Sequence, residues 1–169
     1  SVYAQLKRSY NFSKIIASGL SAGGYGVTRL ASFFPSSAIS KDLVAIIPFS
    51  TSEGYGITAV ASTVASGIGV WAFGDDPGDV HGVNTHNFYN SLVKNGVPRK
   101  YRWTNMKPRG HGGWNDYYNP SWHDMDGKSI YDWSSEFTGG PSDSVPPVEV
   151  TRKLIATLKV YDNGDIEKQ

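Results

Sequence analysis

The stretch KIIASGLSAGGYGVTRLASFFP, residues 14–35, decides the fold of this chain. Its β-branched start, Ile15–Ala17, is typical of a strand buried on both faces, and the residues from about 25 to 34 are compatible with a helix. Between them Ser21 lies in a G-x-S-x-G pattern. We therefore predict a strand, a sharp turn and a helix, with the Ser21 hydroxyl above the end of a sheet and the Ala22 amide at the start of the helix.

The glycines around this serine suggest that the chain is tightly packed at the turn. Gly19 and Gly23 flank Ser21, and we expect a Cβ atom at either position to collide with its surroundings in so tight a turn. Glycine makes up 19 of the 169 residues, so a chance match to the pattern is common. The pattern gains weight only from the strand and helix beside it and from the residues downstream.

Composition excludes several classes of function. A length of 169 residues, 39% of them hydrophobic, suits one domain with a core of its own. The 16 basic and 15 acidic residues nearly cancel, which gives no support to nucleic acid or an anionic membrane as partner. No apolar run approaches the roughly 18 residues of a membrane span. The absence of cysteine excludes disulfides, thiolate zinc sites and a cysteine nucleophile.

Strands alternate with helices along most of the chain. We expect strands at about 13–18, 43–49, 69–73 and 100–106, and helices at 1–10, 57–65, 84–95 and 129–137, with a long polar loop from 108 to about 128. This alternation predicts an α/β fold, in which helices cover both faces of a parallel sheet.

The C-terminal residues differ in character from the rest. Residues 139–150 have the composition of a linker, and residues 153–161 alternate before Asp162-Asn163-Gly164-Asp165, a strong hairpin signal. We therefore divide the chain into a main unit at 1–138, a linker at 139–150 and a β-hairpin at 151–169. The hairpin strands are expected either at an edge of the main sheet or at the start of a further module.

Three chemically active groups follow three of the predicted strands. Ser21 follows the first strand, Asp75, Asp76 and Asp79 follow the third, and His111 follows the fourth. Open α/β sheets place their chemistry at these strand ends. A histidine there can take the proton of a serine hydroxyl that attacks a carbonyl carbon, while a carboxylate orients the imidazole. The chain order Ser, Asp, His is that of the α/β-hydrolase triad.

The segments GLSAGG, VWAFGDDP with NTHNFYNSL, and GHGGWNDYY with IYDW resemble the catalytic half of a secreted-type α/β-hydrolase. The families that they resemble are the family 1 carbohydrate esterases (feruloyl and acetylxylan esterases) and the polyhydroxybutyrate-depolymerase-like esterases. The similarity covers residues 1–138, and its most specific part is Gly110-His111-x-x-Trp114. The resemblance implies a serine esterase without cofactor or metal, with Ser21 as nucleophile, His111 as general base and Ala22 as the first oxyanion donor.

The acid departs from the family pattern. The family has Gly-x-x-Asp after this strand, which would place the carboxylate at position 77, where this chain has Pro77. We favour Asp76 as the acid over Asp79 and rank Asp75 third. The alternative for all three is turn chemistry, which Asp, Pro and Gly favour in any loop.

Aromatic and histidine residues lie near these positions in the sequence. Trp114 and Tyr117 are expected either to pack against the histidine loop or to stack on a sugar or an aromatic acyl group of a substrate. His81 could line the pocket, and His86 is expected on the surface of its helix. No spacing of histidine and carboxylate residues along the sequence suggests a metal site.

The resemblance also implies a missing part. An α/β-hydrolase has about four strands before its nucleophile, and a loop after one of them supplies the second oxyanion donor. We expect this chain to be the C-terminal portion of a larger catalytic domain, with the N-terminal portion as its partner. The family implies secretion or a periplasmic location and a polysaccharide or small-molecule ester as substrate.

Three other interpretations remain open. A prolyl-oligopeptidase-like serine peptidase shares the order of the triad and would cleave peptide amides. An inactive hydrolase fold would serve as a binding or structural portion. An unrelated α/β domain would carry the three motifs by chance.

Overall fold

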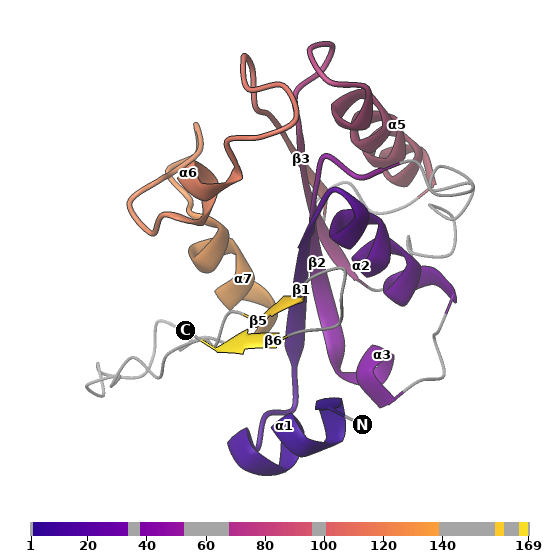
Figure 1. The fold of residues 1–169 in the computed structure, drawn as a ribbon, viewed down its shortest axis with the longest axis vertical. Helices are drawn as coiled ribbons and strands as arrows, with labels where there is room; N and C mark the ends of the chain where they lie inside the picture. Colours follow the sequence, from indigo (N-terminus) through magenta and orange to yellow (C-terminus); the bar gives the residue numbers. More distant parts are fainter. Residues whose placement is uncertain are drawn as a thin grey trace.

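Four parallel strands form the sheet at the centre of the molecule (Figure 1). The computed structural model describes residues 2–33, 38–52, 68–95, 101–138, 158–160 and 166–168. The strands are β1 (Ile15–Leu20), β2 (Leu43–Phe49), β3 (Gly69–Gly74) and β4 (Tyr101–Asn105), in the spatial order β1-β2-β3-β4. Each pairs in parallel with the next. The predicted parallel α/β sheet is confirmed.

Helices cover both faces of this sheet. The described helices are α1 (Val2–Tyr10), α2 (Ala22–Phe33), α3 (Ala38–Asp42), α5 (Val80–Asn95), α6 (Trp114–Tyr118) and α7 (Ile130–Thr138). Helices α2 and α5 lie on one side of the strands and α6 and α7 on the other (Figure 1). Helix α6 lies within the segment predicted to be a loop, and the predicted helix at 57–65 lies outside the described residues.

The alternation of side chains along β3 explains why both faces need cover. Val70 and Ala72 are fully buried in the same core cluster as Phe88 of α5. Trp71 and Phe73, also fully buried, point the other way into the cluster beneath α6 and α7. A strand that is apolar at every position requires two covered faces, as its unbroken hydrophobic sequence predicts.

Strand β1 differs from this pattern. None of its six residues is buried, whereas all of β3 and all but one residue of β2 are. Ile15 and Ala17 pack against one core cluster, and Ile16 and Leu20 against the other, so both faces of this strand are covered as predicted, but its residues are only half-buried or exposed. The physical reason is its position: β1 is an edge strand, paired only with β2 among the described residues, so one side of it stays open.

The predicted C-terminal hairpin is present where the structure describes it. Strands β5 (Leu158–Val160) and β6 (Ile166–Lys168) pair antiparallel, with Lys159 opposite Glu167. In the described residues they form a two-stranded sheet of their own, separate from the main sheet. The proposed linker at 139–150 lies outside the described residues.

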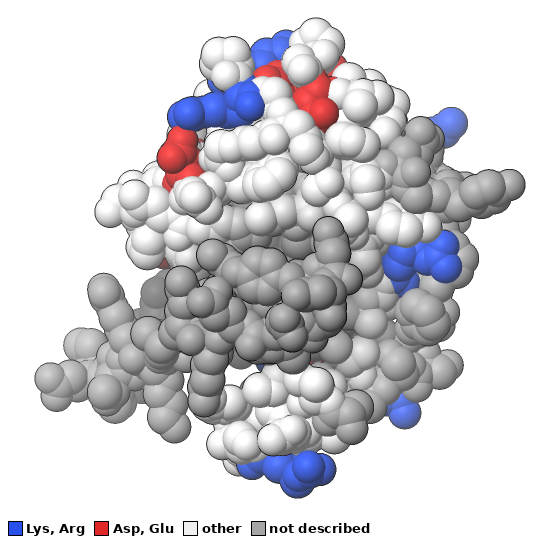
Figure 2. Space-filling model, viewed as in Figure 1, with Lys and Arg blue, Asp and Glu red and all other residues white. Residues whose placement is uncertain are grey.

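The distribution of surface charge and the hydrophobicity of the helices are relevant to possible partners. On the face in Figure 2, basic and acidic side chains lie in small groups, and some groups of opposite charge are neighbours. Among the described residues, Arg109 and Asp116 form an ion pair with a distance of 2.6 Å from nitrogen to oxygen. Among the described helices none has the length and hydrophobicity needed to span a membrane.

Candidate active site

Ser21 alone joins the end of β1 to the start of α2. Its φ of +52° is in the left-handed region, which residues other than glycine seldom adopt. The Ser21 N–H donates to the Phe49 carbonyl at 2.9 Å, and the Ser21 carbonyl accepts from the Tyr25 N–H at 3.1 Å. These bonds hold the serine in the sharp strand-to-helix turn that the G-x-S-x-G pattern predicts.

Two glycines permit this turn, Gly19 and Gly24, and only Gly19 was among those predicted to do so. A Cβ on Gly19 would lie 2.2 Å from the Gly23 carbonyl oxygen, so the collision expected at Gly19 is confirmed. A Cβ on Gly23 would meet nothing within 4 Å, so the same expectation is wrong there. Gly23 contributes its backbone to the close approach, while its own Cβ would point into open space. The second constrained position is Gly24, whose Cβ would lie 2.9 Å from the Phe49 carbonyl oxygen.

The structure brings together a hydroxyl, an imidazole and a carboxylate from three separate loops. The Ser21 Oγ lies 3.0 Å from His111 Nε2, and His111 Nδ1 lies 2.9 Å from Asp79 Oδ2. We call these three residues the triad. Ser21 is half-buried, the side chain of His111 is 35% exposed, and that of Asp79 is only 6% exposed. The group that would meet a substrate is accessible, and the carboxylate is shielded from water.

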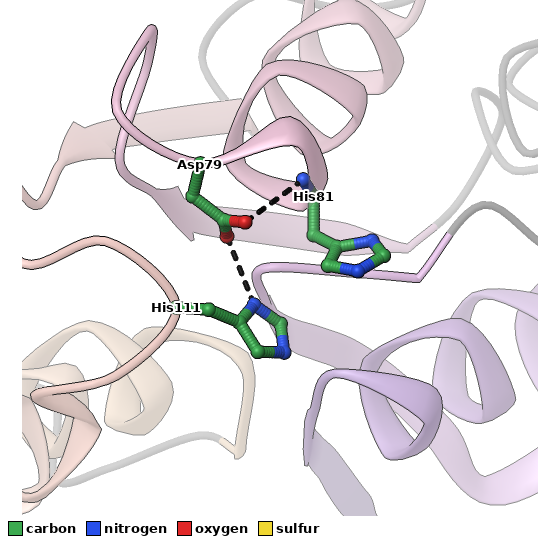
Figure 3. A group of neighbouring side chains, drawn as sticks. All are labelled: Asp79, His81 and His111. Carbon is green, nitrogen blue, oxygen red and sulfur yellow. Dashed lines mark hydrogen bonds and ion pairs between the residues drawn. The ribbon is translucent and has the colours of Figure 1, made fainter.

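Asp79 owes its position to helix α5. It immediately precedes Val80, and its carboxylate accepts the N–H groups of His81 at 3.2 Å and Gly82 at 3.1 Å, as an N-cap does. This cap makes α5 begin four residues earlier than residue 84, where the sequence analysis placed it. Figure 3 shows the bond from the His81 amide and the bond to His111 on the two carboxylate oxygens.

The same contacts set the charge of this carboxyl. Burial alone would raise the pKa of Asp79, but the hydrogen bond with His111 and the N–H groups of His81 and Gly82, together with the charge of His111, outweigh it and hold the pKa below its ordinary value. Asp79 is therefore an ionised acceptor beside the imidazole at neutral pH.

The preference for Asp76 as the acid is wrong. The Asp76 carboxylate pairs with Nδ1 of His86, whose ring stacks on Trp103 at 4.5 Å. The Asn105 side chain binds both the Asp76 N–H and its carbonyl, at 3.3 and 2.8 Å, and so fixes that residue at the end of β4. His86 is also half-buried in this stack rather than a freely exposed surface residue. The sequence analysis began this helix at residue 84, so it gave no sign that Asp79 directly precedes the helix.

Asp75 has a role that the sequence analysis missed. Only 2% of it is exposed, and its Oδ2 accepts the backbone N–H groups of Arg109 at 2.7 Å and Gly110 at 2.6 Å. Its Oδ1 faces the Gly78 N–H at 3.3 Å. One buried carboxylate therefore ties the loop after β3 to the residue directly before His111. Asp75 is a positioning residue rather than a third candidate acid.

The aromatic residues beside His111 divide into two groups. The Trp114 ring lies edge-on to the His111 ring, 5.2 Å away at 89°, and is only partly buried. Tyr117 is 8% exposed, packs on Phe73 at 5.4 Å, and burial raises the pKa of its hydroxyl. Of the two roles expected for Tyr117, the structure supports packing, because the residue belongs to the core. A substrate contact for Trp114 stays a prediction.

Two further residues adjoin the triad. Ala22 is exposed and is the first residue of α2, where a helix presents free N–H groups, and its role as an oxyanion donor stays a prediction. The His81 ring lies 4.6 Å from the His111 ring. Asp79, His81 and His111 each offer a ligand atom within 4.8 Å of the others, a grouping that could hold a metal ion. Chain spacing could not reveal it, since His111 comes from a different loop.

Comparisons with known proteins give a distant structural likeness. No family model and no curated protein matches the sequence. A solved structure described as that of a thermostable esterase is similar, with 22% sequence identity and a TM-score of 0.48. The match covers 80% of this chain and 32% of that one, so this chain spans about a third of its length.

Proposed function

We propose that this chain is the catalytic portion of a serine hydrolase that cleaves carboxylic esters through an acyl-enzyme. The observation that carries the proposal is the triad itself, with distances of 3.0 Å from Ser21 Oγ to His111 Nε2 and 2.9 Å from His111 Nδ1 to Asp79 Oδ2. Both lie within the range at which a nucleophile, a base and an orienting acid act together. The left-handed conformation of Ser21 supports the same role, because it exposes the hydroxyl at the turn.

The first half of the reaction forms the acyl-enzyme. Ser21 Oγ attacks the ester carbonyl carbon while its proton passes to His111 Nε2, and a tetrahedral intermediate with a negative oxygen results. When that intermediate collapses, the bond between the carbonyl carbon and the alcohol oxygen breaks. His111 gives its proton to the departing alkoxide, and the acyl group remains on Ser21.

The second half restores the enzyme. A water molecule gives a proton to His111 Nε2 as its oxygen attacks the acyl carbon, and the new tetrahedral intermediate releases the carboxylic acid when His111 returns the proton to Ser21. Asp79 accepts the Nδ1–H of the imidazole throughout and stabilises the imidazolium. It stays ionised, in keeping with its lowered pKa.

The negative oxygen of each intermediate requires hydrogen-bond donors. We assign the Ala22 N–H as the first donor, because it stands at the N-terminus of the 12-residue helix α2, directly after the nucleophile. The second donor is expected from the N-terminal portion of the same hydrolase domain. Strand β1 offers that portion a docking edge, since it is open on one side among the described residues. On this proposal the fold is a partial α/β-hydrolase fold.

The substrate class follows from the resemblance and from one side chain. An acylated polysaccharide or a similar small ester is the proposed substrate, and a secreted or periplasmic protein is the proposed context. Trp114 stands beside His111 with part of its ring exposed, where it can stack on a sugar or an aromatic acyl group.

Hydrolysis of matched substrates tests the proposal. We expect turnover of p-nitrophenyl acetate and of feruloyl or acetyl esters, and no turnover of peptide p-nitroanilides. Ser21→Ala is expected to remove this turnover, and Ser121→Ala, a change at an exposed serine outside the triad, is the control. Faster cleavage of the anilides would favour the peptidase interpretation. If this chain together with the proposed N-terminal portion turns over none of these substrates, the result would favour an inactive hydrolase fold.

A further inference from the structure

His81 is the residue beside the triad that the proposed reaction does not use. It is the second residue of α5, and its backbone N–H helps to hold the Asp79 carboxylate. Its ring lies against His111, with the ring centroids 4.6 Å apart. The His81 Nδ1 atom is buried and has no hydrogen-bond partner among the described residues. Buried polar atoms are nearly always paired, so this nitrogen calls for a ligand.

The His81 side chain and two side chains beside it, those of Asp79 and His111, are suitable metal ligands. One carboxylate oxygen of Asp79 and one imidazole nitrogen each of His81 and His111 lie within 4.8 Å of one another (Figure 3). Two imidazoles and a carboxylate are a common ligand set for zinc, which then keeps a fourth position open for water. In the described residues, this is the one such group of three histidine and acidic residues.

The geometry requires one side chain to move. Ligand atoms of a tetrahedral zinc ion lie about 3.3 Å apart, given metal–ligand bonds of about 2.0–2.1 Å. Asp79 Oδ2 and His111 Nδ1 are already 2.9 Å apart. The remaining separations, up to 4.8 Å, need a shift of the His81 ring of roughly 1.5 Å, which rotation about its side-chain bonds supplies.

We propose that Asp79, His81 and His111 form a binding site for a zinc ion, and that zinc bound there blocks the triad. A zinc ion on His111 Nε2 occupies the lone pair that must accept the serine proton. A zinc ion on His111 Nδ1 replaces the bond to Asp79 that orients the ring. Either way His111 stops acting as a base. Binding itself is independent of the proposed hydrolysis, whereas the inhibition rests on it.

Calorimetric titration with zinc chloride, on chain free of any polyhistidine tag, tests the binding. We expect one zinc ion per wild-type chain. His81→Ala keeps the backbone N–H that caps Asp79 and removes only the imidazole, so we expect its zinc affinity to fall at least about tenfold. His123→Ala is the matched control, because His123 is an exposed histidine whose Nε2 lies 3.8 Å from a different carboxylate, Asp132. Its affinity should equal that of the wild type.

Ester hydrolysis supplies the second measurement. Zinc is expected to inhibit the wild type reversibly, with recovery on adding a chelator, and to inhibit His81→Ala only at concentrations at least about tenfold higher. Equal zinc affinity in wild type and His81→Ala, or no binding to an otherwise active chain, would overturn the proposal. Zinc binding that depends on His81 in a chain without esterase activity would leave the metal site standing and contradict the proposed function instead.

Discussion

At the scale of single residues, two members of the triad could be predicted from their neighbours in the sequence, and the third could not. Ser21 and His111 could be predicted, because a G-x-S-x-G turn and a G-H-x-x-W segment each mark one strand end. The acid could not, because the choice among the aspartates after β3 depends on how that loop turns. The Asp79 N–H bonds to the Asp75 carbonyl at 2.9 Å, and this turn brings Asp79, not Asp76, to His111.

Replacement of the two aspartates discriminates between them. Asp79→Asn is expected to lower kcat/KM for a chromogenic ester by about 10³–10⁴-fold, since an amide cannot stabilise the imidazolium and favours the wrong tautomer. Asp76→Asn, which disturbs only the pair with His86, is expected to stay within a few-fold of the wild type. A larger loss from Asp76→Asn than from Asp79→Asn would contradict the assignment of the acid.

At the scale of elements, the turn between β1 and α2 and the loops after β3 and β4 hold the triad together. The sequence predicted that these elements would meet, because parallel strands end at one edge of a sheet. It did not reveal the contact that fixes one loop to another, the buried carboxylate of Asp75 on the Arg109 and Gly110 amides. Such a contact depends on the folded distance between loops, which spacing along the chain does not encode.

Two alanine substitutions test the turn. Gly19→Ala puts a Cβ into the Gly23 carbonyl, so we expect a loss of about 1–3 kcal/mol or more in the free energy of unfolding. Gly23→Ala adds a methyl group in open space within a helix, and stability should be unchanged or up to about 1 kcal/mol higher. Urea unfolding followed by circular dichroism measures both. Equal effects of the two variants would show that the close approach at Gly19 is not the constraint.

The Asp75 contact has its own test. Asp75→Ala removes the acceptor of three N–H groups, those of Gly78, Arg109 and Gly110, and we expect a loss of about 0.5–1.5 kcal/mol for each of these part-buried bonds. Because Asp75 acts through the position of His111, we expect kcat to fall while KM changes little. Asp75→Asn keeps one acceptor oxygen and should recover part of kcat. A rise in KM at constant kcat would instead indicate a contact with substrate.

At the scale of the whole molecule, the sheet and its two core clusters were predictable. Strand β2 occupies the expected residues, Leu43–Phe49, because an unbroken apolar run of strand length suits a strand that is covered on both faces. The short helix α6 was not, since WNDYY is too brief for a periodic pattern to show. Nor was the incomplete burial of β1, because burial depends on which neighbours a strand has as well as on its own residues.

The stability of the molecule should depend on pH through Asp79. The pKa of this carboxyl is lower in the folded state than in the unfolded state, so the unfolded chain binds more protons as the pH falls. The stabilisation is complete above the unfolded pKa of about 4 and is lost as the pH falls through the folded pKa. Urea unfolding from about pH 6 to about pH 3 should therefore show the wild type losing its advantage over Asp79→Asn. A constant difference between the two would contradict the lowered pKa.

The central claim, that the hydroxyl of Ser21 is activated by His111, is tested most directly by covalent labelling with a fluorophosphonate and peptide mapping. The proposal predicts one modified residue, Ser21, in the wild type and far slower labelling in His111→Ala, although that variant keeps the serine. Labelling at another serine, or labelling of Ser21 at the same rate without the imidazole, would contradict it.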